Sequence, residues 1–184
     1  MSKKIFWFLG NFLIIFSVAS LIFTYYPYVA TYFFPPELTT PPKVGLFIQI
    51  PKIKAQAPII KNVSVVNEVQ YRAALKRGVA LAKGTAIPGD NGGSFIFAHS
   101  SDYPWNISRY NTIFLRLGEL SRGDVIKIFR DGKELDYVVK DKKTVWPTEV
   151  KYLKQIKNKE IVIQTCTPVG TDLQRLLIFA DPKK

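Results

Sequence analysis

The chain has 184 residues, which allows one ordinary domain plus an additional segment. It carries 26 Lys and Arg residues against 14 Asp and Glu residues, a net charge of +12 at pH 7. The basic residues are scattered rather than gathered in a stripe with aromatic side chains, which argues against a nucleic-acid partner. The single cysteine, Cys166, excludes an internal disulfide.

The first 34 residues predict a membrane anchor. The segment Ile5–Phe23 is almost wholly apolar, and no charged residue lies between its start and Pro36. As a helix, this segment extends about 28 Å, close to the thickness of a bilayer core. Lys3 and Lys4 precede it, and a short basic flank favours the cytoplasmic side. We therefore expect a single pass through a cell membrane, with residues 1–4 in the cytoplasm and the rest of the chain outside.

A cleaved signal peptide is the alternative interpretation of this segment, because Val18–Ser20 offers small residues for processing. The apolar run continues to Phe23, longer than a typical signal core, which favours the uncleaved anchor. Beyond Pro36 the net charge is +10, the chain's +12 less the two N-terminal lysines. This charge suits solubility beside an anionic envelope, or attraction to anionic wall polymers or lipids.

Residues 35–43 predict a linker, followed by a domain of residues 44–184. Four prolines lie between Pro35 and Pro42, and such a stretch favours an extended, semi-rigid polyproline conformation. After it, short apolar runs recur between turn signals. The runs expected to be strands are Gly45–Lys52, Ala57–Ile60, Gly93–Ala98, Asp124–Arg130, Glu134–Lys140, Glu160–Thr165 and Arg175–Ala180.

Helical signals in this domain are few. Asn67 is expected to cap a helix over Glu68–Lys76, and Thr148 a turn that runs through Lys154. Many short strands at near-regular spacing are typical of an antiparallel sandwich or barrel. About 140 residues suffice to close a barrel around a filled core. The sequence therefore predicts an all-β domain with short helices.

Cys166 and His99, the only histidine, each stand at the end of an apolar, strand-like run. A rigid strand holds the sulfur in place, and the loop beyond it leaves space for a substrate. The thiolate is the nucleophilic form of cysteine and needs positive charge nearby. Arg175 follows Cys166 by nine residues and opens the next strand, so pairing of the two strands would bring its guanidinium beside the thiol. His99 would carry the proton between the leaving and incoming groups.

Each of these three residues also has an ordinary structural interpretation. A lone cysteine is often a small buried apolar residue, a lone histidine is often structural, and an arginine that opens a strand is often a solvated edge charge. The matched placement of Cys166 and His99, their uniqueness and the predicted location outside the cell favour catalysis.

The segment IVIQTCTPVGTDLQRLLIFA resembles the active-site segment of the sortases, membrane-anchored cysteine transpeptidases of bacterial surfaces. Both have a strand ending in Thr-Cys, a loop, and an arginine that opens the last strand. Upstream, GTAIPGDNGGSFIFAHS resembles the block that leads to the family's histidine, and IFLRLGELSRGDVIKI and GLFIQIPKIKAQAPII resemble two further blocks. The resemblance covers about residues 44–180, and its Thr-Cys-Thr-Pro and Arg-Leu-Leu details are most similar to class C, D and E sortases.

The resemblance implies a closed β-barrel of about eight strands in which Cys166 is the nucleophile. His99 would be the general acid and base, and Arg175 would stabilise the substrate and the oxyanion. The pair of Cys166 and His99 would resemble a reverse-protonated pair, in which only a minor fraction carries thiolate and imidazolium together. The residues expected to contact the substrate are Ala98, Thr165 and Thr167.

The reaction implied by the resemblance begins with a surface protein that bears a C-terminal sorting signal similar to Leu-Pro-x-Thr-Gly. The enzyme would cut this signal between Thr and Gly and form a thioacyl intermediate. It would then transfer the protein to an amine on a cell-wall precursor or on another protein.

The chain departs from the pilus-building class C pattern before the barrel. Residues 25–44 contain no aspartate, so the Asp-Pro-aromatic lid of that class is not expected, and neither is a C-terminal membrane helix. These departures favour wall anchoring or general surface display over polymerisation. Tyr103, Trp105 and Tyr110 are expected either to line a substrate groove or to form a satellite apolar cluster. No acidic cluster is spaced like a calcium site, and neither a metal nor a cofactor is expected.

Other kinds of envelope protein remain as alternatives. L,D-transpeptidases use a Ser-x-Gly-Cys motif that Gln164–Pro168 does not match, and papain-like wall peptidases place the cysteine before the histidine. A further alternative is an inactive, membrane-tethered barrel that serves as a binding or scaffold domain. The complete set of cysteine, histidine and arginine argues against that one.

Overall fold

The computed structural model describes residues 3–101, 110–149, 151–154 and 156–183. The chain divides into two compact units, Met1–Pro35 and Pro36–Lys184. The first contains helix α1 (Lys3–Phe33), none of whose side chains is buried. Among the described residues, α1 is the one helix long and apolar enough to cross a membrane. An apolar N-terminal helix, as the sequence predicts, is therefore present.

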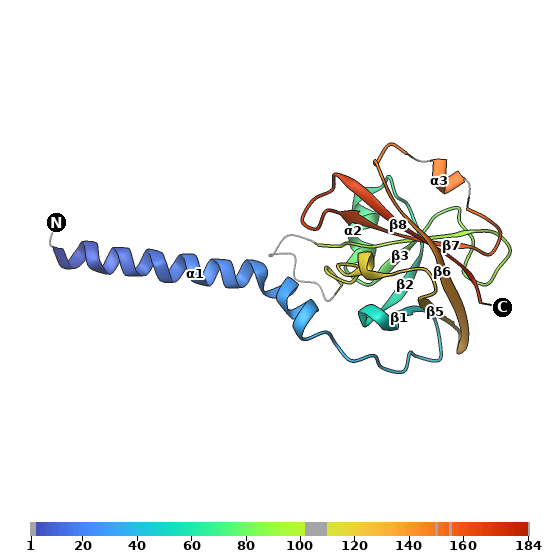
Figure 1. Ribbon diagram of the computed structural model, residues 1–184, viewed down its shortest axis with the longest axis horizontal. Coiled ribbons are helices and arrows are strands. Elements are labelled where there is room, and N and C mark those ends of the chain that lie inside the picture. The colour runs from blue at the N-terminus through green and yellow to red at the C-terminus, as the bar shows by residue number, and fades with distance from the viewer. Residues whose placement is uncertain (1–2, 102–109, 150, 155, 184) are drawn as a thin grey trace. The chain divides into compact units, whose positions relative to one another are not determined.

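In the second unit, the described strands close into a barrel in the order β1-β2-β3-β4-β7-β8-β6-β5 (Figure 1). The strands are β1 (Leu46–Ile50), β2 (Ala55–Val63), β3 (Val79–Ala82), β4 (Ser94–Phe97), β5 (Val125–Arg130), β6 (Lys133–Val145), β7 (Ile161–Thr167) and β8 (Gln174–Pro182). The helical segments are α2 (Glu68–Leu75), α3 (Lys151–Lys154) and the 3-10 turns η1 (Pro51–Ile53) and η2 (Leu117–Glu119). The predicted all-β barrel of eight strands with short helices is confirmed.

The pairing of the strands differs from the sequence expectation in one respect. The pairs β2–β3 and β4–β7 are parallel, where the sequence favours an antiparallel arrangement. Parallel neighbours need a crossover connection, and α2 provides it between β2 and β3. The second parallel pair joins the strand before His99 to the strand that carries Cys166, two of the candidate catalytic residues.

One strand is absent from the sequence prediction. β3 has four residues, all of them buried, so its apolar pattern shows no alternation. β6 is also longer than expected and continues to Val145, because the charged residues 141–143 pair with β8 although their side chains are exposed. Backbone pairing thus continues where the side-chain pattern no longer indicates a strand.

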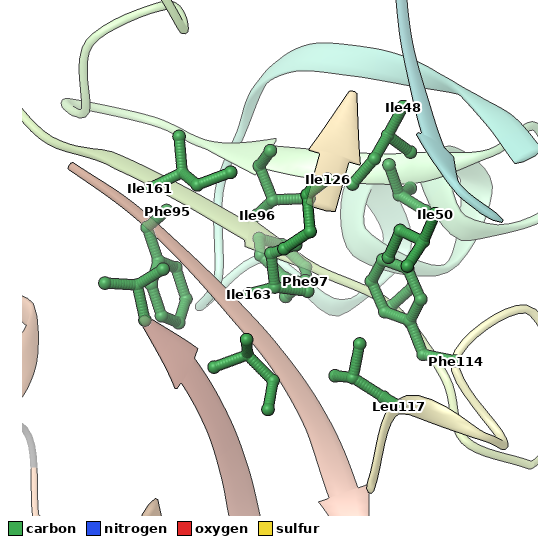
Figure 2. Packing of buried hydrophobic residues seen from close by; sticks show 14 of the residues in the cluster. Ile48, Ile50, Phe95, Ile96, Phe97, Phe114, Leu117, Ile126, Ile161 and Ile163 are labelled. Atoms are coloured by element: carbon green, nitrogen blue, oxygen red, sulfur yellow. The ribbon is translucent and has the colours of Figure 1, made fainter. Parts of the chain in front are cut away.

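The core of the barrel is filled mainly by branched and aromatic side chains. Figure 2 shows Ile48, Ile126 and Ile163, from three different strands, together with the phenylalanines of β4; each of these three isoleucines is at most 1% exposed. Burial of such a side chain stabilises the fold by about 1.5–3 kcal/mol. The first half of β7, Ile161–Ile163, is buried throughout. The strand that presents Cys166 is therefore anchored in the buried core.

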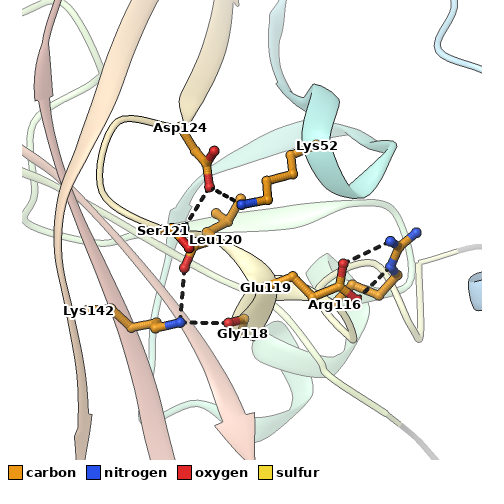
Figure 3. Close-up of polar contacts among 8 residues, drawn as sticks. All are labelled: Lys52, Arg116, Gly118, Glu119, Leu120, Ser121, Asp124 and Lys142. Carbon is orange, nitrogen blue, oxygen red and sulfur yellow. Dashed lines mark hydrogen bonds and ion pairs between the residues drawn. The ribbon is translucent and has the colours of Figure 1, made fainter.

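A network of polar contacts fixes the turn between η2 and β5 (Figure 3). Lys52 of η1 binds the Asp124 carboxylate at 2.8 Å, and the Ser121 backbone N–H donates to the same oxygen at 2.6 Å. Burial alone would raise the pKa of Asp124, but these contacts outweigh it and hold the pKa below its usual range. Lys142 of β6 donates to the backbone carbonyls of Gly118 and Leu120 at 2.7 and 3.0 Å. The turn is thereby attached to η1 and to β6.

Helix α2 begins at Asn67, whose side chain accepts a hydrogen bond from the Gln70 backbone N–H at 3.0 Å. This is the predicted N-cap. After the helix, a Cβ atom on Gly78 would lie 2.2 Å from the Pro58 carbonyl oxygen of β2. Only glycine permits this approach, so the position of α2 against the barrel depends on it.

The linker contacts the barrel through Thr39. Its backbone N–H donates to the Gln56 side chain at 2.9 Å, and its carbonyl accepts from the Gln49 side chain at 3.4 Å. Gln49 and Gln56 are opposite each other on β1 and β2. The extended segment after Pro36 is therefore held against the outer face of these two strands.

Candidate active site

Cys166 lies near the end of β7, and the order of the barrel places this strand between β4 and β8. β4 leads directly to His99, and β8 carries Arg175. The cysteine is therefore on the middle strand, the arginine is on one neighbouring strand, and the histidine lies two residues beyond the end of the other.

The register between β7 and β8 makes Cys166 and Arg175 direct partners. In an antiparallel pair, residues opposite each other present their side chains on the same face of the sheet. The guanidinium of Arg175 is thus on the same face as the thiol, as expected from the loop length in the sequence.

The position of His99 follows from the parallel pairing of β4 with β7. The ladder ends with Phe97 opposite Gln164, and the Ala98 backbone N–H still donates to the Gln164 carbonyl at 3.2 Å. Carried two residues beyond Phe97, this register brings His99 level with Cys166. Neighbouring strands lie about 4.8 Å apart, so the imidazole and the thiol start from adjacent backbones.

Two neighbours hold the His99 residue from other elements. The ring of Tyr71 on α2 meets the imidazole edge-on at 6.1 Å and also stacks on Phe97 at 5.3 Å. The backbone N–H of Phe114 donates to the His99 carbonyl at 3.2 Å. Because β4 ends before the histidine, these contacts replace the strand ladder as its support.

The predicted substrate contacts occupy different places. Thr165 is 3% exposed, and its hydroxyl donates to the Ala98 carbonyl at 3.0 Å, while Ala98 itself is 5% exposed. These two side chains are buried in the seam where the end of β4 meets β7. Thr167 is half-buried and pairs with Gln174 at the start of β8. Contact of any of the three with a substrate stays a prediction.

The charge state of the thiol depends on opposing effects. Burial raises the pKa of Cys166 above its ordinary value, the nearby Arg175 charge lowers it, and the Asp172 carboxylate raises it further, with burial the largest effect. The net result is a raised pKa. In the structure as it stands, the neutral thiol therefore predominates at pH 7, and the thiolate needs a further partner.

The loop between β7 and β8 is held by several hydrogen bonds. Arg175 donates to the backbone carbonyls of Asp172 and Gln174 at 2.7 and 3.2 Å. The Gly170 backbone N–H donates to the Ser101 hydroxyl at 2.9 Å, which ties the loop to the segment after His99. Gly170 has a positive φ of 82°, a conformation that glycine adopts without strain.

Sequence reasoning did not single out Tyr71 or Ser101. For Tyr71 a signal existed, because Tyr71, Ala74 and Leu75 are the apolar positions of one helical face. For Ser101 none existed, since its contact with Gly170 joins residues 69 positions apart.

The aromatic segment after His99 can be followed only in part. Tyr103 and Trp105, two of the three residues expected to line a groove or form a satellite cluster, lie outside the described residues. Tyr110 is partly buried and packs against the core. In the described part of the chain, no group of three or more His, Cys, Asp and Glu residues is arranged to hold a metal ion.

A thiol on a rigid strand, an arginine directly opposite and a histidine just beyond the end of the neighbouring strand on the other side form the arrangement expected of a thiol acyl-transfer site. The family model described as Sortase domain matches residues 48–183. The chain therefore belongs to the sortase family, whose members are cysteine transpeptidases.

Two curated relatives agree with this assignment. Sortase D of Bacillus subtilis (strain 168) is 26% identical over 136 residues, which cover 72% of this chain and 60% of that protein. Sortase A of Bacillus anthracis is 23% identical over 135 residues, covering 73% of this chain and 57% of that protein. The chain spans about three fifths of the length of these relatives.

Solved structures show the same fold. Sortase C of Clostridium perfringens SM101 is 30% identical with a TM-score of 0.59, covering 75% of this chain and 68% of that one. Sortase C of Clostridium perfringens with the C-terminal cell wall sorting motif is 30% identical with a TM-score of 0.61, covering 75% and 69%. Sortase C-1 of Actinomyces oris is 28% identical with a TM-score of 0.63, covering 76% and 73%.

Proposed function

We propose that this protein is a membrane-anchored cysteine transpeptidase of the bacterial surface that recognises a Leu-Pro-x-Thr-Gly-like sorting signal. The observation that carries the proposal is the placement of Cys166 between Arg175, its direct register partner, and His99, level with it across a parallel pair. The similar sortase C that was solved with a C-terminal cell wall sorting motif supports this substrate class.

In the first half of the reaction, the Cys166 sulfur attacks the threonine carbonyl of the signal. The Arg175 guanidinium donates hydrogen bonds to the oxygen that becomes negatively charged. The tetrahedral intermediate collapses, the bond between threonine and glycine breaks, and His99 gives a proton to the departing amine. The surface protein is left as a thioester on Cys166.

In the second half, an amine on a wall precursor or another protein attacks the thioester and gives its proton to His99. The carbon–sulfur bond breaks, Cys166 returns, and the surface protein is joined through a new amide bond. The raised pKa of Cys166 agrees with a resting state in which most molecules hold a neutral thiol. Only the fraction with thiolate and imidazolium together is active in this scheme.

The apolar helix α1 would hold the enzyme in the membrane, with Lys3 and Lys4 on the cytoplasmic side and the barrel outside. In this scheme residues 1–34 are the anchor, residues 35–43 the linker and residues 44–184 the catalytic domain. Surface proteins that carry the signal and an amine acceptor would meet at the membrane surface.

The test uses the full chain in nanodiscs with a small library of fluorogenic sorting-signal peptides and a glycine or hydroxylamine acceptor. Mass spectrometry of the intact protein should find a thioacyl adduct on Cys166, and peptide cleavage should depend on the acceptor. The matched control is Cys166→Ala, which has no other thiol to replace the nucleophile.

Absence of any adduct across the library, with Cys166 still reactive toward iodoacetamide, would contradict transpeptidation of this signal class. An unreactive Cys166 together with tight binding of a signal peptide would instead favour the inactive binding or scaffold domain.

A further inference from the structure

Three exposed valines lie at the start of α2, away from the barrel core. Val65, Val66 and Val69 are 54%, 90% and 81% exposed, and they fall within five consecutive residues. Elsewhere in the described part of the barrel unit, the large apolar side chains with high exposure are Val44, Trp146 and a pair in the β7–β8 loop, Val169 and Leu173. Contiguous exposed apolar groups mark surfaces that meet a partner.

Several hydrogen bonds fix the backbone of the segment that carries these valines. Besides the Asn67 cap, the Gln70 side chain accepts from the Ser64 backbone N–H at 3.2 Å and donates to the Asn62 carbonyl at 3.4 Å. The turn before the helix is thus closed by hydrogen bonds on both sides. The valines are held outward by this frame, because a collapse onto the barrel would break it.

The charge around the valines is strongly positive. Residues 61–83 contain five basic side chains, all exposed, and one acidic side chain, Glu68, which is paired with Arg72 at 2.7 Å. The basic residues of this segment are Lys61, Arg72, Lys76, Arg77 and Lys83. Exposed apolar side chains on a basic segment fit an anionic lipid surface, since the valines can enter the boundary of the acyl chains while the cations of the same segment meet the headgroups.

We infer that the segment of residues 61–83, which runs from the end of β2 through α2 and β3, docks on an anionic membrane surface through its exposed side chains. The inference rests on the proposed anchor, because α1 places the barrel next to a bilayer in the first place. The same helix carries Tyr71, which contacts both Phe97 and His99. Docking through α2 would therefore bring His99 close to the lipid surface. A sorting signal carried in the membrane would be presented there.

The first test places a fluorophore on the patch of the full chain. Val66→Cys in a Cys166→Ala background is labelled with an environment-sensitive dye and incorporated into nanodiscs of phosphatidylcholine alone or with phosphatidylglycerol. We expect the emission to shift to the blue and to be quenched by lipid-borne quenchers, more strongly with phosphatidylglycerol. Trp146→Cys is the matched control, because Trp146 is 56% exposed and lies on a different segment, and its dye should stay as in water.

Equal emission from the two positions in both lipids overturns the inference. A blue shift at position 66 that lipid-borne quenchers do not reach also overturns it, because the dye then lies against protein rather than in lipid. Co-elution of the chain with nanodiscs reports the anchor separately, and the Cys166→Ala background makes the result independent of the proposed reaction.

The second test measures the consequence for turnover with the triple variant Val65→Ser, Val66→Ser, Val69→Ser. With a sorting-signal peptide attached to a lipid in the same nanodisc, we expect the rate to fall about fivefold or more, and with the soluble peptide to stay within about twofold. Equal loss with both peptides, or loss with neither, contradicts the docking role. If neither peptide reacts even with the unmodified chain, the proposed function fails while the fluorescence result stands.

Discussion

The two sides of Cys166 are built in different ways. On one side, Arg175 is a direct partner in an antiparallel ladder, and its position follows from the backbone register. On the other side, His99 lies beyond the end of β4 and is held by Tyr71, by Phe114 and by the seam bond from Thr165 to Ala98. The arginine is thus placed by local strand pairing, while the histidine depends on contacts between elements far apart in the chain.

The largest expected effect comes from removing the guanidinium of Arg175, the register partner of Cys166. Arg175→Ala should lower kcat by about 10²–10³-fold, because it removes the donors proposed to face the oxyanion. Arg175→Lys is the matched control, since it keeps the charge but not the bidentate geometry, and it should recover only part of the loss. Steady-state kinetics with a sorting-signal peptide measure both, and near-normal rates in Arg175→Ala would remove this residue from the mechanism.

Removal of the hydrogen bond from the Thr165 hydroxyl to the Ala98 carbonyl tests the support of His99. Thr165→Val keeps the shape of the side chain but leaves the buried Ala98 carbonyl without the hydroxyl donor. We expect a loss of about 1–3 kcal/mol in the free energy of unfolding and an altered pH–rate profile, because the separation of His99 and Cys166 is no longer fixed.

Thr165→Ser retains the hydroxyl and should recover most of the activity and its pH dependence. Chemical denaturation and pH–rate profiles separate the two effects. If Thr165→Val changes the stability alone, the seam supports the fold but does not position the pair.

The pKa of the Cys166 thiol tests the electrostatic effect of Arg175 and of its loop on the cysteine. Because burial raises the pKa of Cys166, alkylation by iodoacetamide should increase with pH and reach its plateau at a higher pH than for an ordinary cysteine. Asp172→Asn should move the midpoint to lower pH, since the carboxylate raises the pKa, and Arg175→Ala should move it to higher pH. A midpoint below that of a model cysteine peptide would mean that another group stabilises the thiolate in the resting enzyme.

The smallest expected effect comes from the hydrogen bond that joins the β7–β8 loop to the segment after His99. Ser101→Ala removes the acceptor for the Gly170 backbone N–H and should cost about two- to fivefold in kcat/KM, because both groups are exposed and water can replace the bond. Hydrogen exchange at Gly170 should become faster. Unchanged exchange in the variant would show that Ser101 does not hold the loop.

The sequence predicts the position of Arg175 beside Cys166 better than it predicts the position of His99. A strand, a short loop and a second strand bring Cys166 and Arg175 together with little freedom, so nine residues of spacing were enough. His99 could be chosen for its uniqueness, but its level with Cys166 depends on a parallel register that no local pattern encodes. The buried strand β3 was missed because its residues show no apolar alternation. The hydrogen bonds of Thr165 and Ser101 join residues that lie far apart in the chain, so no local pattern indicates them.

The half-buried, predominantly neutral thiol also has a consequence for resistance to oxidation at the proposed location outside the cell. Oxidants such as hydrogen peroxide react with the thiolate, so a raised pKa slows the formation of sulfenic acid. The chain has no second cysteine to resolve such a product as an internal disulfide. Once formed, the sulfenic acid depends on an external reductant for repair, and slow oxidation is the protection that the barrel itself supplies.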